Sequence, residues 1–151
     1  MAGLTNLYVK RVLSPEVANF IGVFSCDNIP NTTLEKYSFV CNLSKHDEQG
    51  THFVAVLVNK RSRVAHYIDP YGANCSNKHI REYLARTCHF MRWSNKAIQP
   101  LPSDYCGYYC IAYLLANSRG ITHKKFMSKF KREGDANNDL TVLKLINTLL
   151  K

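Results

Sequence analysis

Two apolar segments in the middle of the chain, His52–Val58 and Val64–Asp69, constrain the fold more than any other feature. The first (HFVAVLV) is apolar on both alternating faces and rich in Val, which indicates a strand covered on both sides. The polar residues between the segments (NKRSR) are typical of a tight hairpin. We therefore expect a central pair of antiparallel strands with other elements packed against both faces.

Weaker patterns fill in the rest of an α+β domain, with a central, mainly antiparallel sheet flanked by helices. We expect helices over Ser14–Gly22, Ser76–His89, Cys106–Asn117, Thr122–Lys131 and Asn138–Leu150, and further strands over Tyr37–Leu43 and Lys96–Gln99. No repeat, low-complexity tract or Gly/Ser/Pro-rich linker interrupts the sequence. Residues 1–151 are therefore expected to form a single domain.

The chain is basic, with 20 Lys and Arg against 11 Asp and Glu among 151 residues, a formal net charge of +9. Such an excess attracts polyanions, chiefly nucleic acids. The densest basic stretch runs from Arg119 to Arg132, where apolar residues recur at helical spacing. It fits an amphipathic helix with a solvated basic face, and also a sequence-independent nucleic-acid surface.

The sequence has no apolar run long enough to cross a bilayer and no secretory signal at its N-terminus. We therefore expect a protein that is neither secreted nor bound in a membrane, with its six cysteines as free thiols. Zinc is disfavoured because no CxxC pair occurs and the available spacings fit no zinc module. The spacings considered are Cys106 and Cys110 with His123, and Cys88 with His89.

The hairpin suggests one chemical pairing. If its loop is Lys60–Arg61, His52 lies directly opposite Asp69, and opposed residues on antiparallel strands share a face. A carboxylate beside an imidazole fixes the tautomer of the ring and stabilises its protonated form. In the competing interpretation His52 merely begins a strand and Asp69 merely opens the Asp69–Gly72 turn.

Cys106 strengthens the catalytic interpretation. It lies where a polar turn gives way to an apolar helix, and the positive end of the helix macrodipole favours a thiolate there. Gln99, seven residues earlier, could direct its side-chain NH₂ toward the oxyanion that forms when a thiolate attacks a carbonyl. Cys110, one turn further along the helix, is expected to be a small core residue.

The ordered set of His52-Phe53, Asp69-Pro70-Tyr71-Gly72, Gln99 and Cys106-Gly107-Tyr108-Tyr109-Cys110 resembles the adenain family of viral maturation proteases. That family is related to the SUMO-specific and other ubiquitin-like-protein proteases. The resemblance extends over most of residues 19–117 and begins at Asn19–Phe24. It implies the fold of these cysteine proteases, and it fades in the C-terminal helices.

By this resemblance Cys106 is the nucleophile, His52 the general base and then general acid, and Asp69 its orienting partner. Gln99 and the backbone N–H of Cys106 form the oxyanion hole. Two residues depart from the family pattern. Asp69 stands where adenain has Glu, and Phe53 replaces the Trp that commonly follows the His, which changes the packing expected over the imidazole.

The resemblance also implies partners. Cys88 stands at the interval before Gln99 at which adenain has a cysteine that forms a disulfide with an activating viral peptide. An ordinary buried cysteine on the last helical turn is the competing interpretation. Adenain uses DNA as a cofactor, which gives the basic stretch Arg119–Arg132 a role, and no small-molecule cofactor is implied.

The expected function is that of a viral cysteine endopeptidase that cleaves capsid and core precursor proteins during particle maturation, in the virion and the host nucleus. Small-residue sites of the Gly-Gly or Gly-X type are the expected targets. Two alternatives stay open: a deSUMOylating or deubiquitinating protease acting on host conjugates, and a non-catalytic basic protein that binds nucleic acid.

Overall fold

The computed structural model describes residues 4–47, 52–101, 103–131 and 133–150. The elements in chain order are α1 (Asn6–Leu13), β1 (Phe20–Ser25), β2 (Lys36–Asn42), β3 (Phe53–Asn59), β4 (Val64–Ile68), α2 (Lys78–Ala85), β5 (Phe90–Trp93), α3 (Cys106–Ser118), α4 (His123–Met127) and α5 (Asn138–Leu149). In these residues the strands form one sheet in the order β1-β2-β3-β4-β5. The β2–β3 and β3–β4 pairings are antiparallel, and the outer pairings, β1–β2 and β4–β5, are parallel.

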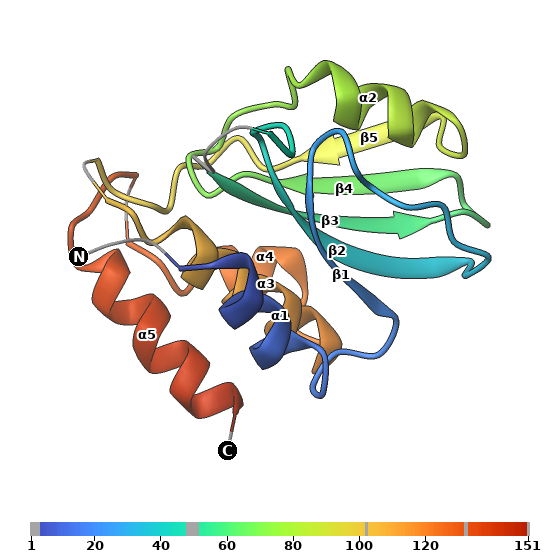
Figure 1. The fold of residues 1–151 in the computed structure, drawn as a ribbon. Coiled ribbons are helices and arrows are strands. Elements are labelled where there is room, and N and C mark those ends of the chain that lie inside the picture. Colours follow the sequence, from blue (N-terminus) through green and yellow to red (C-terminus); the bar gives the residue numbers. More distant parts are fainter. Residues whose placement is uncertain (1–3, 48–51, 102, 132, 151) are drawn as a thin grey trace.

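Helices cover both faces of this sheet. Figure 1 shows α2 on one face and α1, α3 and α4 on the other, with α5 beyond them. Side chains of β3 alternate between two apolar clusters, so that Phe53 and Ala55 pack on the α3 side and Val54 and Val56 on the α2 side. The expected α+β class and the central, doubly covered strand are confirmed, and the sheet is mixed.

The helix α3 is the core of the helical side. Ten of its residues are buried, from Cys106 and Gly107 through Ala116. It packs against β3, α1 and α5. The expected boundaries of α3 and α5 are each confirmed to within one residue. Because α3 is fixed on three sides, its first residue, Cys106, is held at a defined place beside the start of β3.

The first expected helix is wrong. The chain forms α1 earlier, with the Thr5 hydroxyl accepting from Tyr8 N–H at its N-terminus. Ser14 ends this helix, donating its N–H to Lys10 O at 2.9 Å, and does not begin one. Pro15 follows a helix end, another position that proline favours. The residues up to Gly22 then turn and enter β1, the strand that contains most of Asn19–Phe24.

Three other boundaries differ from expectation. Asn77, not Ser76, caps α2, and α2 ends at Ala85. Residues 96–99 form no strand, whereas β5 lies at Phe90–Trp93, where mostly exposed side chains leave no burial pattern to detect. The helix α4 begins after Thr122 as expected but ends at Met127 rather than Lys131.

The hairpin between β3 and β4 has a longer turn than expected. Asn59 pairs with Val64 rather than Ser62, so the register is displaced by two residues. The Asn59 side-chain oxygen accepts from Arg61 N–H and Ser62 N–H, which closes the turn. Arg63 adopts a left-handed φ of 60°, which accommodates the additional residues. The expected direct opposition of His52 and Asp69 is therefore wrong as a register, since continuing the observed ladder places Tyr71 opposite His52.

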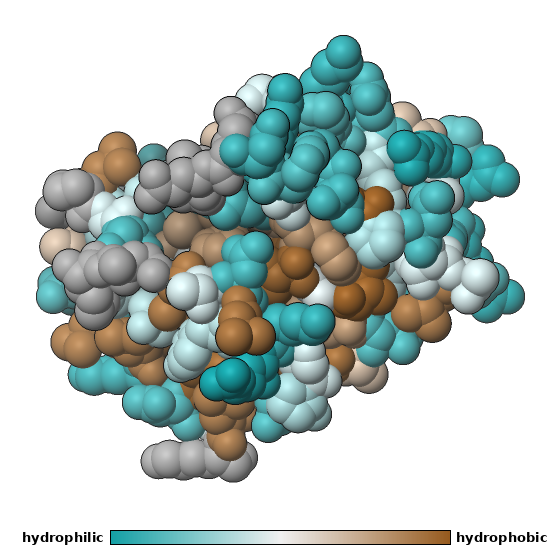
Figure 2. Space-filling view, in the orientation of Figure 1, coloured by the Kyte–Doolittle hydropathy of each residue, from teal (hydrophilic) through white to brown (hydrophobic). Residues whose placement is uncertain are grey.

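The two sides of the molecule differ in surface character. Figure 2 shows a mostly hydrophilic surface around α2 and more hydrophobic surface around α1 and α5. Exposed Leu7 and Tyr8 lie on α1, and Leu140 lies on α5. Among the described residues, none of the helices is both long enough and apolar enough to span a bilayer.

Candidate active site

One end of the central hairpin meets the N-terminus of α3. His52 immediately precedes β3, Asp69 immediately follows β4, and Cys106 is the first residue of α3. Because β3 and β4 are antiparallel, the start of β3 and the end of β4 lie at the same end of the hairpin. The fold thus brings the expected imidazole and carboxylate together although the expected register is wrong.

His52 and Asp69 form a largely buried ion pair. His52 Nε2 lies 2.8 Å from Asp69 Oδ1, and their side chains are 14% and 6% exposed. Asp69 Oδ1 also accepts the Tyr71 N–H at 2.8 Å. An ionised carboxylate can only accept, so Asp69 holds a hydrogen on Nε2 and leaves Nδ1 of the neutral ring free to take a proton.

The surroundings of His52 favour its protonated form. Burial lowers the pKa of the imidazole, but hydrogen bonding and charge from Asp69 and Cys106 outweigh burial and raise the pKa to about 9. The ring is also covered by Tyr71, whose ring centroid lies 5.0 Å away with the planes 19° apart. At neutral pH His52 is therefore largely an imidazolium.

The Cys106 sulfur lies next to this pair. It is 8% exposed, and it accepts the Phe53 backbone N–H at 3.5 Å. A Cβ on Gly107, the next residue, would stand 3.2 Å from Leu4 Cβ and 3.4 Å from Phe53 Cδ2, so glycine permits close packing here. Cys110 is fully buried, and burial raises the pKa of its thiol well above the ordinary value, which confirms it as a core residue.

Gln99 is buried beside the loop that leads into α3. Its Nε2 donates to Ser103 O at 3.1 Å and to Ser103 Oγ at 3.3 Å. Its Oε1 is buried and has no hydrogen-bond partner among the residues that the structure describes. Ser103 O also accepts from the hydroxyl of Tyr71, the residue stacked on His52. Gln99 is thus connected to the His52–Asp69 pair through one shared acceptor.

The turn that follows Asp69 holds this arrangement in place. Pro70 O accepts from Ile98 N–H and Gln99 N–H, at 2.9 and 3.0 Å. Gly72 has a φ of +76°, and a Cβ there would stand 2.8 Å from Ala97 N. The turn is therefore pressed against the segment before Gln99, so Asp69 and Gln99 are positioned by the same contact.

Comparisons with known proteins bear on this geometry. No protein-family model matches the sequence, and neither does any curated protein. Solved structures do match. The crystal structure of the ASFV pS273R protease superposes with a TM-score of 0.62 at 16% identity, covering 98% of this chain and 67% of that one. SUMO protease Ulp1 superposes with a TM-score of 0.50 at 12% identity, covering 99% of this chain and 80% of that one.

This is the adenain/Ulp1-type cysteine protease fold. It is the fold that the sequence resemblance implied. The cluster of His52, Asp69, Gln99 and Cys106 lies where the hairpin end meets the first turn of α3, and all four side chains come from segments that this protease fold holds together.

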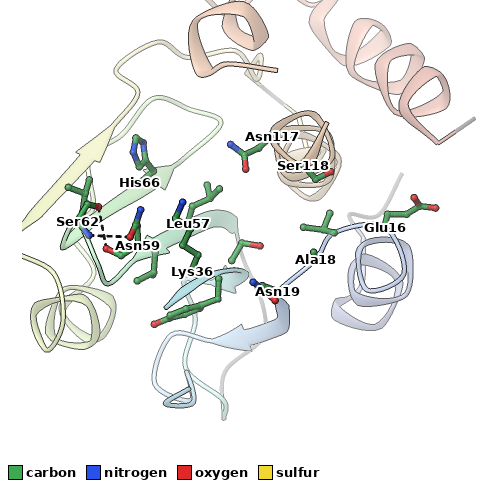
Figure 3. Close-up of a pocket in the computed structure, with 15 residues that line it drawn as sticks. Glu16, Ala18, Asn19, Lys36, Leu57, Asn59, Ser62, His66, Asn117 and Ser118 are labelled. Carbon is green, nitrogen blue, oxygen red and sulfur yellow. Dashed lines mark hydrogen bonds between the residues drawn. The ribbon is translucent and has the colours of Figure 1, made fainter. Parts of the chain in front are cut away.

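Cys88 lies apart from this cluster. It follows the end of α2 rather than occupying its last turn, and it is partly exposed. It lines a cavity of about 500 Å³ together with Phe90 and Trp93 of β5. A second cavity, of about 480 Å³, lies over the other end of the sheet, between the β3–β4 turn and the end of α3 (Figure 3). None of the four clustered residues lines either cavity.

Three contributors to the cluster were not expected from the sequence. Tyr71, rather than the residue after His52, covers the imidazole, because Phe53 points into the core. Ser103 and Asp139 form the network behind Gln99. The Asp69–Gly72 turn motif contained a signal for Tyr71, whereas nothing in the sequence connects Asp139 to Gln99. No group of three or more potential metal ligands occurs in the part of the chain that the structure describes.

Proposed function

We propose that the protein is a cysteine endopeptidase that uses Cys106, His52, Asp69 and Gln99. The supporting observation is the His52–Asp69 pair at 2.8 Å, next to a sulfur that begins a buried helix. The fold match to proteases supports the same reaction class. A structural role alone does not require a buried imidazolium beside a thiol.

In the proposed mechanism the active form has the Cys106 proton already on His52 Nδ1, as a thiolate beside an imidazolium, and the thiolate attacks the carbonyl carbon of the scissile peptide bond. The resulting oxyanion is stabilised by the Gln99 NH₂ and the Cys106 N–H. His52 then gives its proton to the leaving amine, and a thioester remains on Cys106. A water molecule, deprotonated by His52, attacks the thioester, and the thiol is restored when the acid product leaves.

We further propose that the substrates are viral capsid and core precursor proteins, cleaved at small-residue sites in the virion and the host nucleus. The match to a protease of ASFV supports a viral role. Action on SUMO or ubiquitin conjugates is the second candidate, favoured by the match to a SUMO protease. Precursor-derived peptides and SUMO conjugates, offered side by side, separate the two.

The direct test of activity is cleavage of a peptide library with and without DNA, with Cys106→Ala as the blank. The proposal predicts cleavage by the wild type that the blank lacks, with Cys88→Ala as a matched variant that keeps basal activity. A folded wild type that cleaves nothing under any condition contradicts the enzyme proposal and favours the non-catalytic nucleic-acid-binding alternative.

Cys88 is proposed as the attachment point of an activating peptide through a disulfide. Its partial exposure in a cavity beside exposed Phe90 and Trp93 supports this role, because a peptide could reach the thiol and bury the two aromatic rings. Wild type and Cys88→Ala would be mixed with cysteine-containing precursor peptides under mild oxidation. Greater activation of the wild type is expected, and equal activation of both proteins contradicts the thiol switch.

DNA is proposed as a cofactor bound by the basic stretch Arg119–Arg132. The exposed lysines of this stretch are Lys124, Lys125, Lys129 and Lys131. Three apolar side chains of the same stretch, Phe126, Met127 and Phe130, are buried. Arg119 is occupied by Glu16 and by the end of α5, and Arg132 lies outside the described residues. The lysines therefore carry this proposal.

A further inference from the structure

A carboxylate of the C-terminal helix reaches the loop behind Gln99. Asp139, in the first turn of α5, accepts the Ser103 hydroxyl at 3.0 Å through Oδ2 and at 3.3 Å through Oδ1. Its Oδ1 also accepts the Tyr109 hydroxyl at 2.8 Å. Ser103 Oγ in turn lies 3.1 Å from Tyr105 N and 3.3 Å from Gln99 Nε2. One hydroxyl therefore connects α5, the residue that precedes α3, and Gln99.

The number of hydrogens fixes the direction of these bonds. A serine hydroxyl has one hydrogen and two lone pairs. The Asp139 carboxylate can only accept, so it takes the hydrogen, and the lone pairs of Ser103 Oγ accept from Tyr105 N–H and the Gln99 amide. Ser103 O is also an acceptor. Ser103 thus presents only acceptors to Gln99, which requires the NH₂ group of Gln99, not its carbonyl oxygen, to face Ser103.

In the described part of the chain, no hydrogen bond on the other side of the amide sets this orientation. Gln99 Oε1 is buried and has no hydrogen-bond partner among the described residues, so no bond there opposes a flip of the amide. Without Asp139, the Ser103 hydroxyl could turn and donate to Oε1, and the amide could flip. The orientation of Gln99 is therefore held from the Ser103 side, and Asp139 determines which way the hydroxyl points.

We propose that Asp139 is a positioning residue that acts through Ser103 to keep the Gln99 NH₂ directed toward the reacting carbonyl oxygen. This inference rests on the proposed protease function. Ser103 O and Oγ belong to one residue and can share one amide hydrogen in a three-centre bond. The second amide hydrogen is then left for the oxyanion. The amide is linked to His52 through Tyr71, which stacks on His52 and donates to the same Ser103 O that accepts from Gln99.

Four variants test this role. Ser103→Ala and Asp139→Ala break the connection from its two ends. Tyr109→Phe removes the other bond to Asp139 and leaves the Ser103 contact, so it is the control for a weakened α3–α5 interface. We expect the first two to lower kcat for peptide cleavage by about tenfold, part of the 10²–10³-fold lost with a whole oxyanion-hole donor, with little change in KM. Tyr109→Phe should stay within about twofold of the wild-type kcat.

Gln99→Ala provides the decisive background. If Asp139 acts through Gln99, Asp139→Ala has no further effect on kcat once Gln99 is removed, because the two losses are not additive. An equal loss of kcat in both backgrounds, or an equal loss in Tyr109→Phe, overturns the proposal and leaves Asp139 with a structural role. These kcat comparisons can be made only if the wild type cleaves substrate. A negative result for Asp139 is therefore distinct from the absence of any cleavage, which would contradict the enzyme proposal.

A spectroscopic measurement gives an answer even if no substrate is cleaved. The sequence has only two glutamines, Gln49 and Gln99, so selective ¹⁵N-glutamine labelling gives two side-chain NH₂ pairs, and Gln99→Ala assigns them. Ser103→Ala and Asp139→Ala should both shift the Gln99 pair and speed its hydrogen exchange, whereas Tyr109→Phe should not. An unchanged Gln99 pair in folded Asp139→Ala contradicts the positioning role.

Discussion

At the scale of single residues, the site depends on how one carboxylate oxygen is shared. Asp69 Oδ1 accepts from both His52 Nε2 and Tyr71 N–H, each at 2.8 Å. The same Tyr71 covers the imidazole with its ring and donates its hydroxyl to Ser103 O. The charge that stabilises the imidazolium and the ring that shields it are therefore held by the same short turn.

The pH dependence of activity should report this pairing. The imidazolium is present below the raised His52 pKa of about 9, so kcat/KM of the wild type should fall as the pH rises through about 9. Asp69→Asn keeps the shape but removes the charge. We expect its kcat/KM to be about 10²-fold lower and its alkaline limb to move toward pH 6.5. An alkaline limb at the same pH in both proteins contradicts the role of Asp69.

Stability should depend on pH through the same group. His52 has a higher pKa in the folded protein than the 6.5 of an unperturbed histidine, so its stabilisation is complete below pH 6.5 and is lost as the pH rises through about 9. Because Cys106 also raises the His52 pKa, the free energy of unfolding of the wild type should exceed that of Asp69→Asn by at most roughly 3 kcal/mol at pH 6.5, and by less at pH 9.5. Urea denaturation at several pH values measures this, and a pH-independent difference contradicts it.

At the scale of elements, the site residues lie at the ends of strands and helices: at the start of β3, in the turn after β4 and in the first turn of α3. The sequence pattern predicted these three elements because β3 and α3 are buried on nearly every side. It missed β5, because mostly exposed side chains give no alternation of buried and exposed positions. It also misplaced the first helix, because Ser-Pro is found both at the start of a helix and just after its end, and Ser14-Pro15 follows α1. The hairpin register depended on the Asn59 side chain closing a longer turn, which periodicity does not encode.

The same distinction applies to the site residues. His52, Asp69, Gln99 and Cys106 could be proposed from the sequence because their residue types and their order resemble a known pattern. Ser103 and Asp139 could not, since they are brought together by the packing of α5 on α3, 36 positions apart in the chain.

The turn after Asp69 should tolerate no side chain at Gly72. Alanine there would adopt a left-handed φ, which costs about 1–2 kcal/mol, and its Cβ would overlap the backbone at Lys96 and Ala97. We expect Gly72→Ala to lower the free energy of unfolding by about 2–4 kcal/mol in all. Gly120→Ala is the matched control, with a φ of +80° and no atom within 4 Å of the added Cβ. Equal losses in urea denaturation contradict the close contact.

At the scale of the whole molecule, the position of the basic residues decides what the net charge of +9 does. The described part of the stretch 119–132 forms an amphipathic surface as expected, with apolar side chains packed inward and four lysines exposed. Such a surface fits a solvated helix face as well as a nucleic-acid contact. Only the dependence of DNA binding on these lysines separates the two.

DNA binding should therefore respond to where positive charge is removed. The triple variant of Lys124, Lys125 and Lys129 to Gln should reduce the slope of log K against log salt by about 2–3, since each neutralised phosphate contributes about 0.9. Changing exposed Lys36, Arg61 and Lys78 to Gln removes the same charge elsewhere and should leave the slope nearly unchanged. If both triple variants change the slope equally, the basic stretch is a solvated surface and not the DNA-binding site.

The most direct test of the central claim is the rate at which each cysteine reacts with iodoacetamide, followed by mass spectrometry at pH 7. Accessibility alone predicts that Cys88 reacts first, because it is partly exposed whereas Cys106 is 8% exposed. If Cys106 is a nucleophile beside an imidazolium, it should react fastest of the cysteines, and His52→Ala should remove this difference in rate. Preferential labelling of Cys88, with Cys106 no faster than buried Cys41, would contradict the assignment of Cys106 as the nucleophile.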